Sequence, residues 1–355
     1  MIGFMGSLKF LLAVTITFSW NTVFSQDLLT YGNAPVKSKS QWQLKRAAIL
    51  DSMQAVMGNL PTREPNPPSV QILDSLKEKS YTRFSLKMTV APSEDIFAYL
   101  YIPVSAKSKK YPAILALHET DVLGKKSVDG QGKNKNLAYG KELAEKGYVV
   151  IAPDYPSLGD AKDYDFKTDR YKSGTMKAIF NHIRCIDFLA NRTYVDSKYI
   201  GVIGHSLGGH NAIFVGAFDT RIKVVVASCG WTLFDFYNIG AERSKAYGGR
   251  LGPWAQERYM PFLREKYGLD PERTPFDFDQ VIAAIAPRAF FSNSPVSDSN
   301  FDVNGVKKGV SNAAVVYNFL GAKDRLQVRY PESGHDFPTE VRFEAYAFID
   351  SVLKK

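Results

Sequence analysis

The chain has 355 residues, of which 45% are hydrophobic and 13% aromatic, and it carries a formal net charge of +9. This length suits one large α/β domain or two ordinary ones, and the apolar content is ample for a buried core, which excludes a chain that is disordered throughout. Basic and acidic residues are interspersed, so no continuous phosphate-binding track forms and nucleic acid is not expected as a partner.

The first residues, 1–25, are predicted to be a secretory signal peptide. Lys9 precedes an apolar run from Phe10 to Phe18, and Val23 to Ser25 suits a processing site before Gln26. A single membrane anchor is the alternative, but the run is shorter than the about 20 apolar residues that a spanning helix needs. We therefore expect export to the periplasm or the extracellular space, without stable membrane insertion after processing.

Residues 26–68 predict a lead-in segment rather than a domain. One amphipathic helix is expected around Trp42 to Met57, and a proline-rich connector, LPTREPNPP, follows it. The pattern then changes to strands, because FSLKMTV and IFAYLYIPV alternate in a way that suits antiparallel pairing.

After Tyr111 the chain alternates between short apolar runs and helical patterns. The runs are AILALH, YVVIAPDY, IGVIGH, KVVVASCG, RAFFSNSP and RLQVRYPESG. Strands of this kind are buried on both faces, which predicts an α/β fold with a doubly wound, mostly parallel sheet and the preceding hairpin as its antiparallel leading edge. An aromatic-rich stretch at 231–285 interrupts the alternation. One domain over 69–355 with an insertion fits this order better than two domains.

A serine stands in the motif GHSLGG, from Gly204 to Gly209. The surrounding stretch KYIGVIGHSLGGHNAIFVGAF passes from a strand pattern through the motif into a helical pattern without a break. A serine on such a turn is held in a strained backbone position with its hydroxyl above the sheet, whereas the alternative is only a small residue in a tight turn. We expect Ser206 to be a nucleophile, with the backbone N–H of Leu207 pointing at the developing oxyanion.

A serine hydroxyl becomes reactive only when a histidine accepts its proton. His335 follows the strand pattern RLQVRYPESG in a Gly-His-Asp turn, where a loop at the C-terminal end of a strand would overhang the sheet. We expect His335 to be the base, and a solvated or core role is the alternative. The other histidines lie at a strand end, inside a helical pattern or beside the turn that carries Ser206: His118, His182, His205 and His210.

The acid that orients the histidine should come from the loop after the preceding strand, RAFFSNSPVSDSNFD. Asp298 is the favoured residue, while Asp302 and Asp235 remain open, and capping of a loop is the alternative role for each. The order Ser206, Asp298 and His335 along the chain is the order that strand-elbow-helix hydrolases use.

Five stretches carry a resemblance to a known superfamily: ILALHET, GHSLGGHNA, FDTRIKVVVASCG, APRAFFSNSPVSD and ESGHDF. From about Tyr81 onwards the sequence resembles the α/β-hydrolase superfamily, and within it the dienelactone-hydrolase-like and acetyl xylan esterase-like branch of exported bacterial carbohydrate esterases. Ser206 stands where dienelactone hydrolases proper have a cysteine, which argues against their substrate. The His-Gly-Gly oxyanion loop of lipases is replaced by His118, Glu119 and Thr120, so a second oxyanion N–H is expected from Glu119 or Thr120.

Candidate substrate contacts follow the ends of the predicted strands. Trp231 comes just after a strand and could stack on a sugar ring, although aromatic residues of an insertion more often form its own core. His118 could contact substrate, although hydrogen bonding within its own loop is favoured. In the basic loop GKKSVDGQGKNKN, Lys125 or Lys126 could attract the carboxylate of a uronic acid, although a solvated, mobile loop is favoured.

The expected activity is that of a serine esterase that removes acetyl or similar acyl groups from a polysaccharide such as xylan through an acyl-enzyme. A glucuronoyl-esterase-like activity and a peptidase related to prolyl oligopeptidases are alternatives among enzymes, and too few residues precede AILALH to form the β-propeller of such a peptidase. A non-catalytic binding protein on a hydrolase scaffold is the alternative of another class.

No cofactor and no metal are expected, because the chain has no His-Glu-x-x-His motif and no close cluster of cysteines and histidines. The two cysteines, Cys185 and Cys229, are too few for a disulfide framework, and a single bridge between them stays open. The sequence leaves the oligomeric state undetermined.

Overall fold

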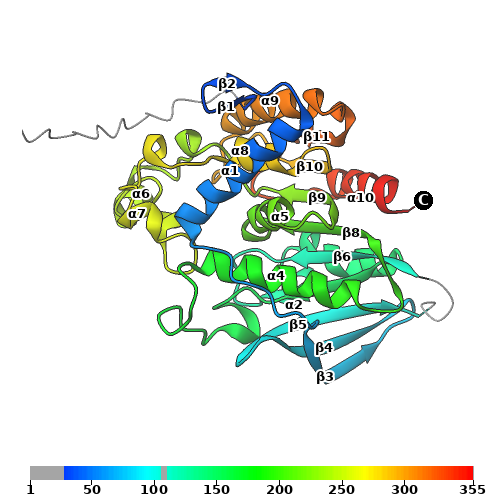
Figure 1. Ribbon diagram of the computed structural model, residues 1–355. Coiled ribbons are helices and arrows are strands. Elements are labelled where there is room, and N and C mark those ends of the chain that lie inside the picture. Colours follow the sequence, from blue (N-terminus) through cyan, green and yellow to red (C-terminus); the bar gives the residue numbers. More distant parts are fainter. Residues whose placement is uncertain (1–27, 105–109, 355) are drawn as a thin grey trace, which may run out of the picture.

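A twisted sheet of nine strands crosses the molecule in the computed structural model, which describes residues 28–104 and 110–354 (Figure 1). The strand order is β11-β10-β9-β8-β6-β7-β5-β4-β3. The strands span these residues: β3 Ser69–Lys77, β4 Tyr81–Ala91, β5 Glu94–Pro103, β6 Tyr111–Leu117, β7 Val149–Pro153, β8 Val195–His205, β9 Ile222–Ser228, β10 Ala289–Asn293 and β11 Leu326–Arg329.

The strands from β6 to β11 are parallel, which confirms the doubly wound sheet expected from their apolar runs. Between them lie helices that include α3 (Tyr139–Glu145), α4 (Gly174–Ala190), α5 (Leu207–Phe218), α9 (Val303–Phe319) and α10 (Thr339–Leu353). From β6 the chain continues to β7 on one side, and from the neighbouring β8 it continues to β9 on the other, so the connections after these two strands run in opposite directions. In open α/β sheets, ligands bind at the carboxyl ends of the strands beside such a reversal.

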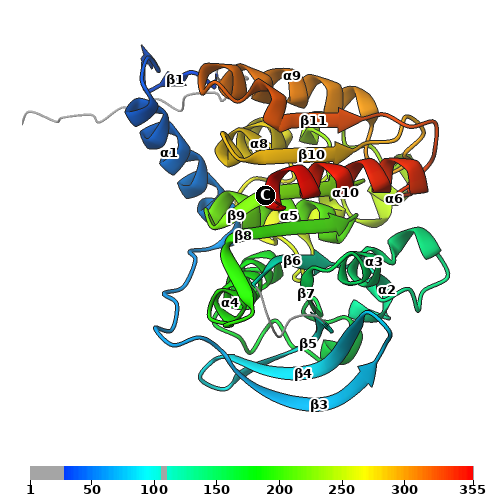
Figure 2. The same ribbon diagram turned by 90° about the vertical axis from the view of Figure 1, so that its right-hand side faces the viewer.

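Alternate residues of the central strands face two separate cores. On β6, Ala113, Leu115 and Leu117 pack in the core that also includes residues of α4 and α5, whereas Ile114 and Ala116 pack in the core with α3 and α10. All five side chains are buried. Figure 2 shows α4 and α3 on opposite sides of β6 and β7, and α10 in front of the strands near β8 and β9. Burial on both faces explains why this strand is apolar throughout.

The antiparallel part of the sheet is larger than expected. The hairpin β4–β5 pairs as predicted, and β5 also pairs antiparallel with β7. The edge itself, however, is β3, which the sequence pattern did not single out. A bulge between Ile72 and Asp74 interrupts its register, and each of its residues is exposed. Because neither face is covered, no clean alternation of apolar and polar residues marks this strand.

The lead-in forms the predicted helix, α1 (Lys39–Met57), on the same side of the sheet as α8 (Phe278–Ile285). Its N-terminus is capped by Ser38, whose hydroxyl accepts a hydrogen bond from the N–H of Gln41. Arg46 donates from Nε to the carbonyl oxygen of Ala284 at 2.8 Å. The lead-in therefore docks on the domain instead of extending away from it.

The aromatic insertion at 231–285 covers one end of the sheet with short helices, including α6 (Ala241–Ala246) and α7 (Phe262–Glu265) (Figure 1). We call its irregular part, residues 231–277, the cap. The predicted signal peptide lies outside the described residues. Within the two described ranges, no helix is long and apolar enough to cross a membrane.

Candidate active site

Ser206 lies on the sharp turn between β8 and α5, with φ 53° and ψ −116°. A Cβ atom on Gly204 would lie 2.1 Å from the carbonyl oxygen of Gly208, and one on Gly208 would lie 1.9 Å from that of Leu117. Neither position can hold a side chain without moving the backbone. The N–H of Ser206 donates to the carbonyl of Ser228 at 2.8 Å, which ties the turn to the end of β9. This turn, which we call the elbow, is therefore held by contacts from both strands beside β8, namely β6 and β9.

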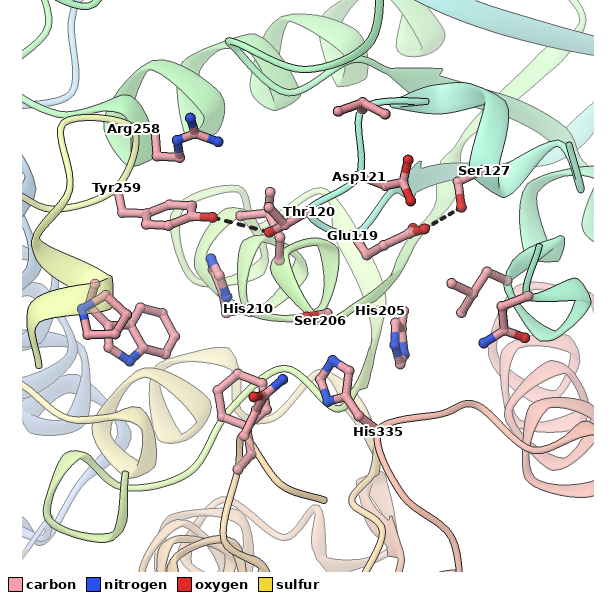
Figure 3. A pocket seen from close by; sticks show the side chains of 18 of the residues that line it. Glu119, Thr120, Asp121, Ser127, His205, Ser206, His210, Arg258, Tyr259 and His335 are labelled. Atoms are coloured by element: carbon pink, nitrogen blue, oxygen red, sulfur yellow. Dashed lines mark hydrogen bonds between the residues drawn. The ribbon is translucent and has the colours of Figure 1, made fainter. Parts of the chain in front are cut away.

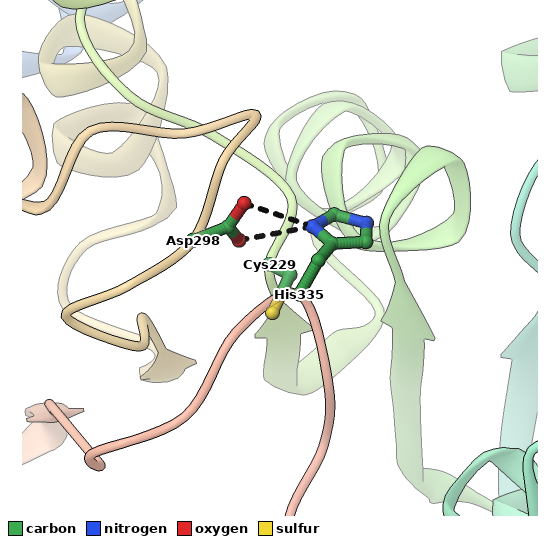
Figure 4. A group of neighbouring side chains, drawn as sticks. All are labelled: Cys229, Asp298 and His335. Atoms are coloured by element: carbon green, nitrogen blue, oxygen red, sulfur yellow. Dashed lines mark hydrogen bonds and ion pairs between the residues drawn. The ribbon is translucent and has the colours of Figure 1, made fainter.

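His335 and Asp298 form the pair that the sequence predicted. Nδ1 of His335 lies 3.0 Å from each carboxylate oxygen of Asp298 (Figure 4). The side chain of Asp298 is 1% exposed, and this burial raises its pKa. Hydrogen bonds from His335 and from the N–H groups of Asn300 and Phe301 lower the pKa by more than burial raises it. The net result is a pKa below the usual value for an aspartate. With Nδ1 committed to Asp298, Nε2 is the nitrogen left to meet a nucleophile.

The other candidate acids have different partners. Asp302 caps α9, where its carboxylate accepts from the N–H of Asn304 at 2.7 Å. Asp235 is 61% exposed at the side chain and lies 3.6 Å from the guanidinium of Arg250. Of the three, Asp298 is the one that hydrogen-bonds His335.

Cys229 lies beside this pair at the end of β9 (Figure 4). Ligand atoms of Cys229, Asp298 and His335 lie within 4.8 Å of one another, which is close enough for a metal ion. Burial, with the negative charge of Asp298, raises the pKa of the thiol well above its usual value, so the thiol keeps its proton. It donates to the carbonyl oxygen of Asp336 at 3.2 Å. Both cysteines are free and buried, so they do not form the bridge that the sequence left open.

The loop after β6 has the place expected for an oxyanion loop. His118 is 3% exposed behind it, where its Nε2 accepts from the N–H of Tyr155 at 2.9 Å and its Nδ1 lies 2.6 Å from the carbonyl of Glu119. The first bond makes Nε2 an acceptor, so Nδ1 carries the proton and donates. His118 is not among the residues that line the cavity described below, and substrate contact by His118 is therefore corrected to a role within the loop.

A cavity of about 920 Å³ opens above the elbow and is lined by Ser206, His335 and Leu207 as well as by Glu119 and Thr120 (Figure 3). One end is polar and includes Glu119, Ser127, Lys133 and Asn134. The other end belongs to the cap and to α5, and its lining includes these aromatic and basic residues: His210, Tyr237, Arg243, Tyr247, Trp254, Arg258 and Tyr259. The candidate nucleophile and base thus lie between two chemically different ends.

Trp231 does not reach this cavity, and its predicted contact with substrate is corrected. It is 1% exposed, and its indole N–H donates to the hydroxyl of Ser292 at 3.0 Å within the core. Trp254 lines the cavity instead, with its ring 4.8 Å from the ring of His210 between centroids. Sequence reasoning missed His210, although it stands in the first turn of α5, where its N–H donates to the carbonyl of Ser206 at 3.1 Å.

The basic loop also differs from expectation. Lys125 is 1% exposed, and its Nζ pairs with Asp154 at 2.6 Å and with Asp160 at 2.5 Å. It anchors the loop and is not available to a substrate carboxylate. The cation of this loop that lines the cavity is Lys133.

Comparisons with known proteins show which families and folds this chain resembles. Residues 153–321 match the family described as glucuronyl esterase, fungi. The chain is 28% identical to YtaP of Bacillus subtilis, a protein named as a hydrolase, over 87% of this chain and all of that protein. A solved glucuronoyl esterase from Solibacter usitatus has a TM-score of 0.72 and 19% identity, with 92% of this chain and 97% of that chain covered.

The chain has the α/β-hydrolase fold. A further relative is the 4-O-methyl-glucuronoyl methylesterase of Hypocrea jecorina, which is 27% identical over 56% of this chain but 45% of its own length. The chain thus spans about half the length of that relative. Several of these relatives are carbohydrate esterases, which are carboxylic ester hydrolases.

Proposed function

We propose that this α/β-hydrolase is a serine esterase that cleaves esters of uronic acids in polysaccharides, with Ser206, His335 and Asp298 as its catalytic triad. The observation that carries the proposal is the cavity of about 920 Å³, in which Ser206 and His335 meet a wide aromatic and basic end. An ester of a uronic acid has a sugar ring on its acyl side, and that ring needs more room than an acetyl group. Aromatic faces such as that of Trp254 suit the apolar faces of sugars.

The geometry supports the following mechanism. Ser206 attacks the carbonyl carbon while its proton passes to Nε2 of His335, and the carboxylate of Asp298 stabilises the imidazolium that forms. The oxyanion accepts from the N–H of Leu207, at the start of α5, and from that of Glu119 or Thr120. The alcohol leaves with the proton of the imidazolium. Water then repeats the attack on the acyl-enzyme and releases the acid.

The cations at the cap suit an acidic saccharide. Arg243 and Arg258 line the aromatic end, and Lys133 lies at the polar rim. A polysaccharide with free uronic acids near the esterified residue is attracted by such charges, and the attraction should weaken as salt is added. The family match and the Hypocrea jecorina relative support the same substrate class.

Removal of acetyl groups from a polysaccharide is the second candidate. It is favoured by a structural neighbour from Bacteroides fragilis that is described as an acetyl xylan esterase, with a TM-score of 0.62 and 18% identity. That neighbour supports the fold. An acetyl group fills little of the cavity, so the sugar that carries it would occupy the rest.

The decisive experiment compares benzyl glucuronate, acetylated xylan and p-nitrophenyl acetate as substrates of the purified protein and of Ser206→Ala. We expect the highest kcat/KM with the glucuronate ester, and a loss of about 10⁴-fold or more in Ser206→Ala, because the nucleophile is absent. A fluorophosphonate probe should label the wild type but not the variant.

If the protein releases only acetate, the second candidate function, removal of acetyl groups, replaces the proposal of a uronic acid esterase. A wild type that neither reacts with the probe nor cleaves any of the three esters would contradict the esterase altogether and favour a binding protein. Ser228→Ala is the matched control, because it removes a hydroxyl near the elbow that does not line the cavity, and it should keep its labelling.

A further inference from the structure

Asp336, the residue after the proposed base, is held from two directions. Its side chain accepts from Nδ2 of Asn134 at 2.8 Å and from Nδ2 of Asn136 at 2.7 Å. Its backbone carbonyl accepts from Nδ2 of Asn293 at 2.8 Å and from the thiol of Cys229 at 3.2 Å. The loop that carries His335 is therefore fastened to the ends of β9 and β10 and to the segment before α3.

The orientation of both amides is determined by their other partners. The side-chain oxygen of Asn134 accepts from the backbone N–H of Asn136 at 2.9 Å. The oxygen of Asn136 accepts from the guanidinium of Arg342 at 3.0 Å. Each asparagine therefore has its NH₂ group left to donate to Asp336, and an ionised carboxylate, which only accepts, is the matching partner. The pKa of Asp336 lies below its usual value, because these amides and the N–H of Phe337 outweigh the effect of burial.

The segment that holds Asp336 also borders the cavity. Gly132, Lys133, Asn134 and Leu137 line its polar end, so one short piece of chain both borders the substrate and holds the loop of the base. Among the described residues, the imidazole of His335 has one hydrogen-bonded anchor, Asp298, and it also contacts the rings of His205 and Phe301 at centroid distances of 4.9 and 5.9 Å. Asp298 orients the imidazole ring, but the height of the ring above the elbow depends on the backbone that carries it.

We propose that Asp336 is a positioning residue, which, clamped between Asn134 and Asn136, holds the backbone of His335 so that Nε2 stays within reach of Ser206. This inference rests on the proposed esterase function. Asp336 does not line the cavity, so it acts through His335 and not on the substrate.

The test is Asp336→Asn with p-nitrophenyl acetate and benzyl glucuronate as substrates. The new NH₂ group would face an asparagine NH₂ group, so the loop shifts, and a misplacement of about 1 Å at a catalytic group costs about 10²-fold in rate. We expect kcat to fall about 100-fold on both esters while KM stays within about two-fold, because the substrate contacts are unchanged.

A swapped pair separates positioning from general damage. When Asn136→Asp is added to Asp336→Asn, the new NH₂ group at position 336 faces a carboxylate oxygen at position 136. The other oxygen of that carboxylate can still accept from the guanidinium of Arg342. We expect this double variant to recover at least about ten-fold of the lost kcat. Asp279→Asn is the matched control, since Asp279 accepts from Nδ2 of Asn312 at 2.8 Å in α8, away from the cavity. It should change the melting temperature but not kcat.

The inference is overturned if Asp336→Asn keeps the wild-type kcat, or if its kcat falls and the swapped pair recovers none of it although both variants are folded. A wild type without any esterase activity is a different result, which contradicts the proposed function and is read from the wild type alone. Circular dichroism of each variant establishes that the fold is retained.

Discussion

The two regions that meet over Ser206 are built in different ways. The loops at the ends of β8, β9, β10 and β11 are held by backbone hydrogen bonds and by close approaches that exclude a side chain, as at Gly204 and Gly208. The cap is held by aromatic packing, with the ring of Trp254 5.6 Å from that of Tyr237 and 6.0 Å from that of Phe234 between centroids. The first region tolerates few substitutions and suits chemistry, whereas the second can change its shape and suits the selection of a substrate.

The largest expected effect tests the first region. Asp298→Asn keeps the size of the side chain but removes the charge that stabilises the imidazolium, and it allows the wrong tautomer of His335. We expect kcat to fall about 10³- to 10⁴-fold, with an unchanged melting temperature, as measured with p-nitrophenyl acetate.

Asp302→Asn is the control for this prediction, because Asp302 lies on the same loop and caps α9. It should cost about 1 kcal/mol of stability or less and leave kcat unchanged, since an asparagine caps nearly as well as an aspartate. If the two variants lose activity equally, Asp298 is not the acid, and the loop as a whole is responsible.

The middle effect tests the cap through two tryptophans that differ in what they contact. Trp254→Leu removes an aromatic face from the cavity, so we expect kcat/KM for benzyl glucuronate to fall about ten-fold while that for p-nitrophenyl acetate changes little. Trp231→Ala removes a core side chain and should cost about 3–5 kcal/mol of stability, with kcat/KM of the folded protein unchanged.

Equal losses of Trp254→Leu on the small and the large ester would contradict a sugar-binding role for the cap. In that case Trp254 supports the elbow through His210, against which its ring packs at a centroid distance of 4.8 Å.

This difference also explains how far the sequence was informative. The parallel strands and the elbow were predicted because a strand buried on both faces is apolar throughout, as β6 is, and because a strand-to-helix turn needs small residues. His335 and Asp298 were predicted because each follows a strand of that sheet. The structure brings these two side chains together, and their catalytic roles stay predictions.

The aromatic residues of the cap could not be sorted in the same way. Trp231 lies in irregular chain and Trp254 lies in a 3-10 helix of four residues, Gly252–Ala255, so neither belongs to an element long enough to show a period of two or of 3.6. Whether such a ring faces the core or the cavity depends on packing between distant segments, such as the bond from Trp231 to Ser292. The edge strand β3 was missed for a related reason, since a strand with both faces exposed has no buried pattern to recognise.

The smallest expected effect compares two histidines, one from each region. His205 lies at the end of β8, where its Nδ1 is 2.9 Å from the hydroxyl oxygen of Ser228. His210 packs against Trp254 of the cap. Burial lowers the pKa of each to about 3, so both are neutral in the folded protein. The unfolded chain binds these protons below about pH 6.5, so the free energy of unfolding falls as the pH drops from about 6.5 to 3.

Replacing His210 by phenylalanine should make this dependence shallower. In the wild type, His210 binds a proton in the unfolded chain but not in the folded protein, and the variant lacks this difference. The slope of the free energy of unfolding against pH should therefore decrease by at most about 1.4 kcal/mol per pH unit. The phenyl ring keeps the contact with Trp254. Urea unfolding at pH 7, 6, 5 and 4 measures the slope. Tyr247→Phe, a cap variant without a titrating group in this range, should keep the wild-type slope. An unchanged slope in His210→Phe would mean that His210 is protonated in the folded cap, which would make it a second cation at the aromatic end of the cavity.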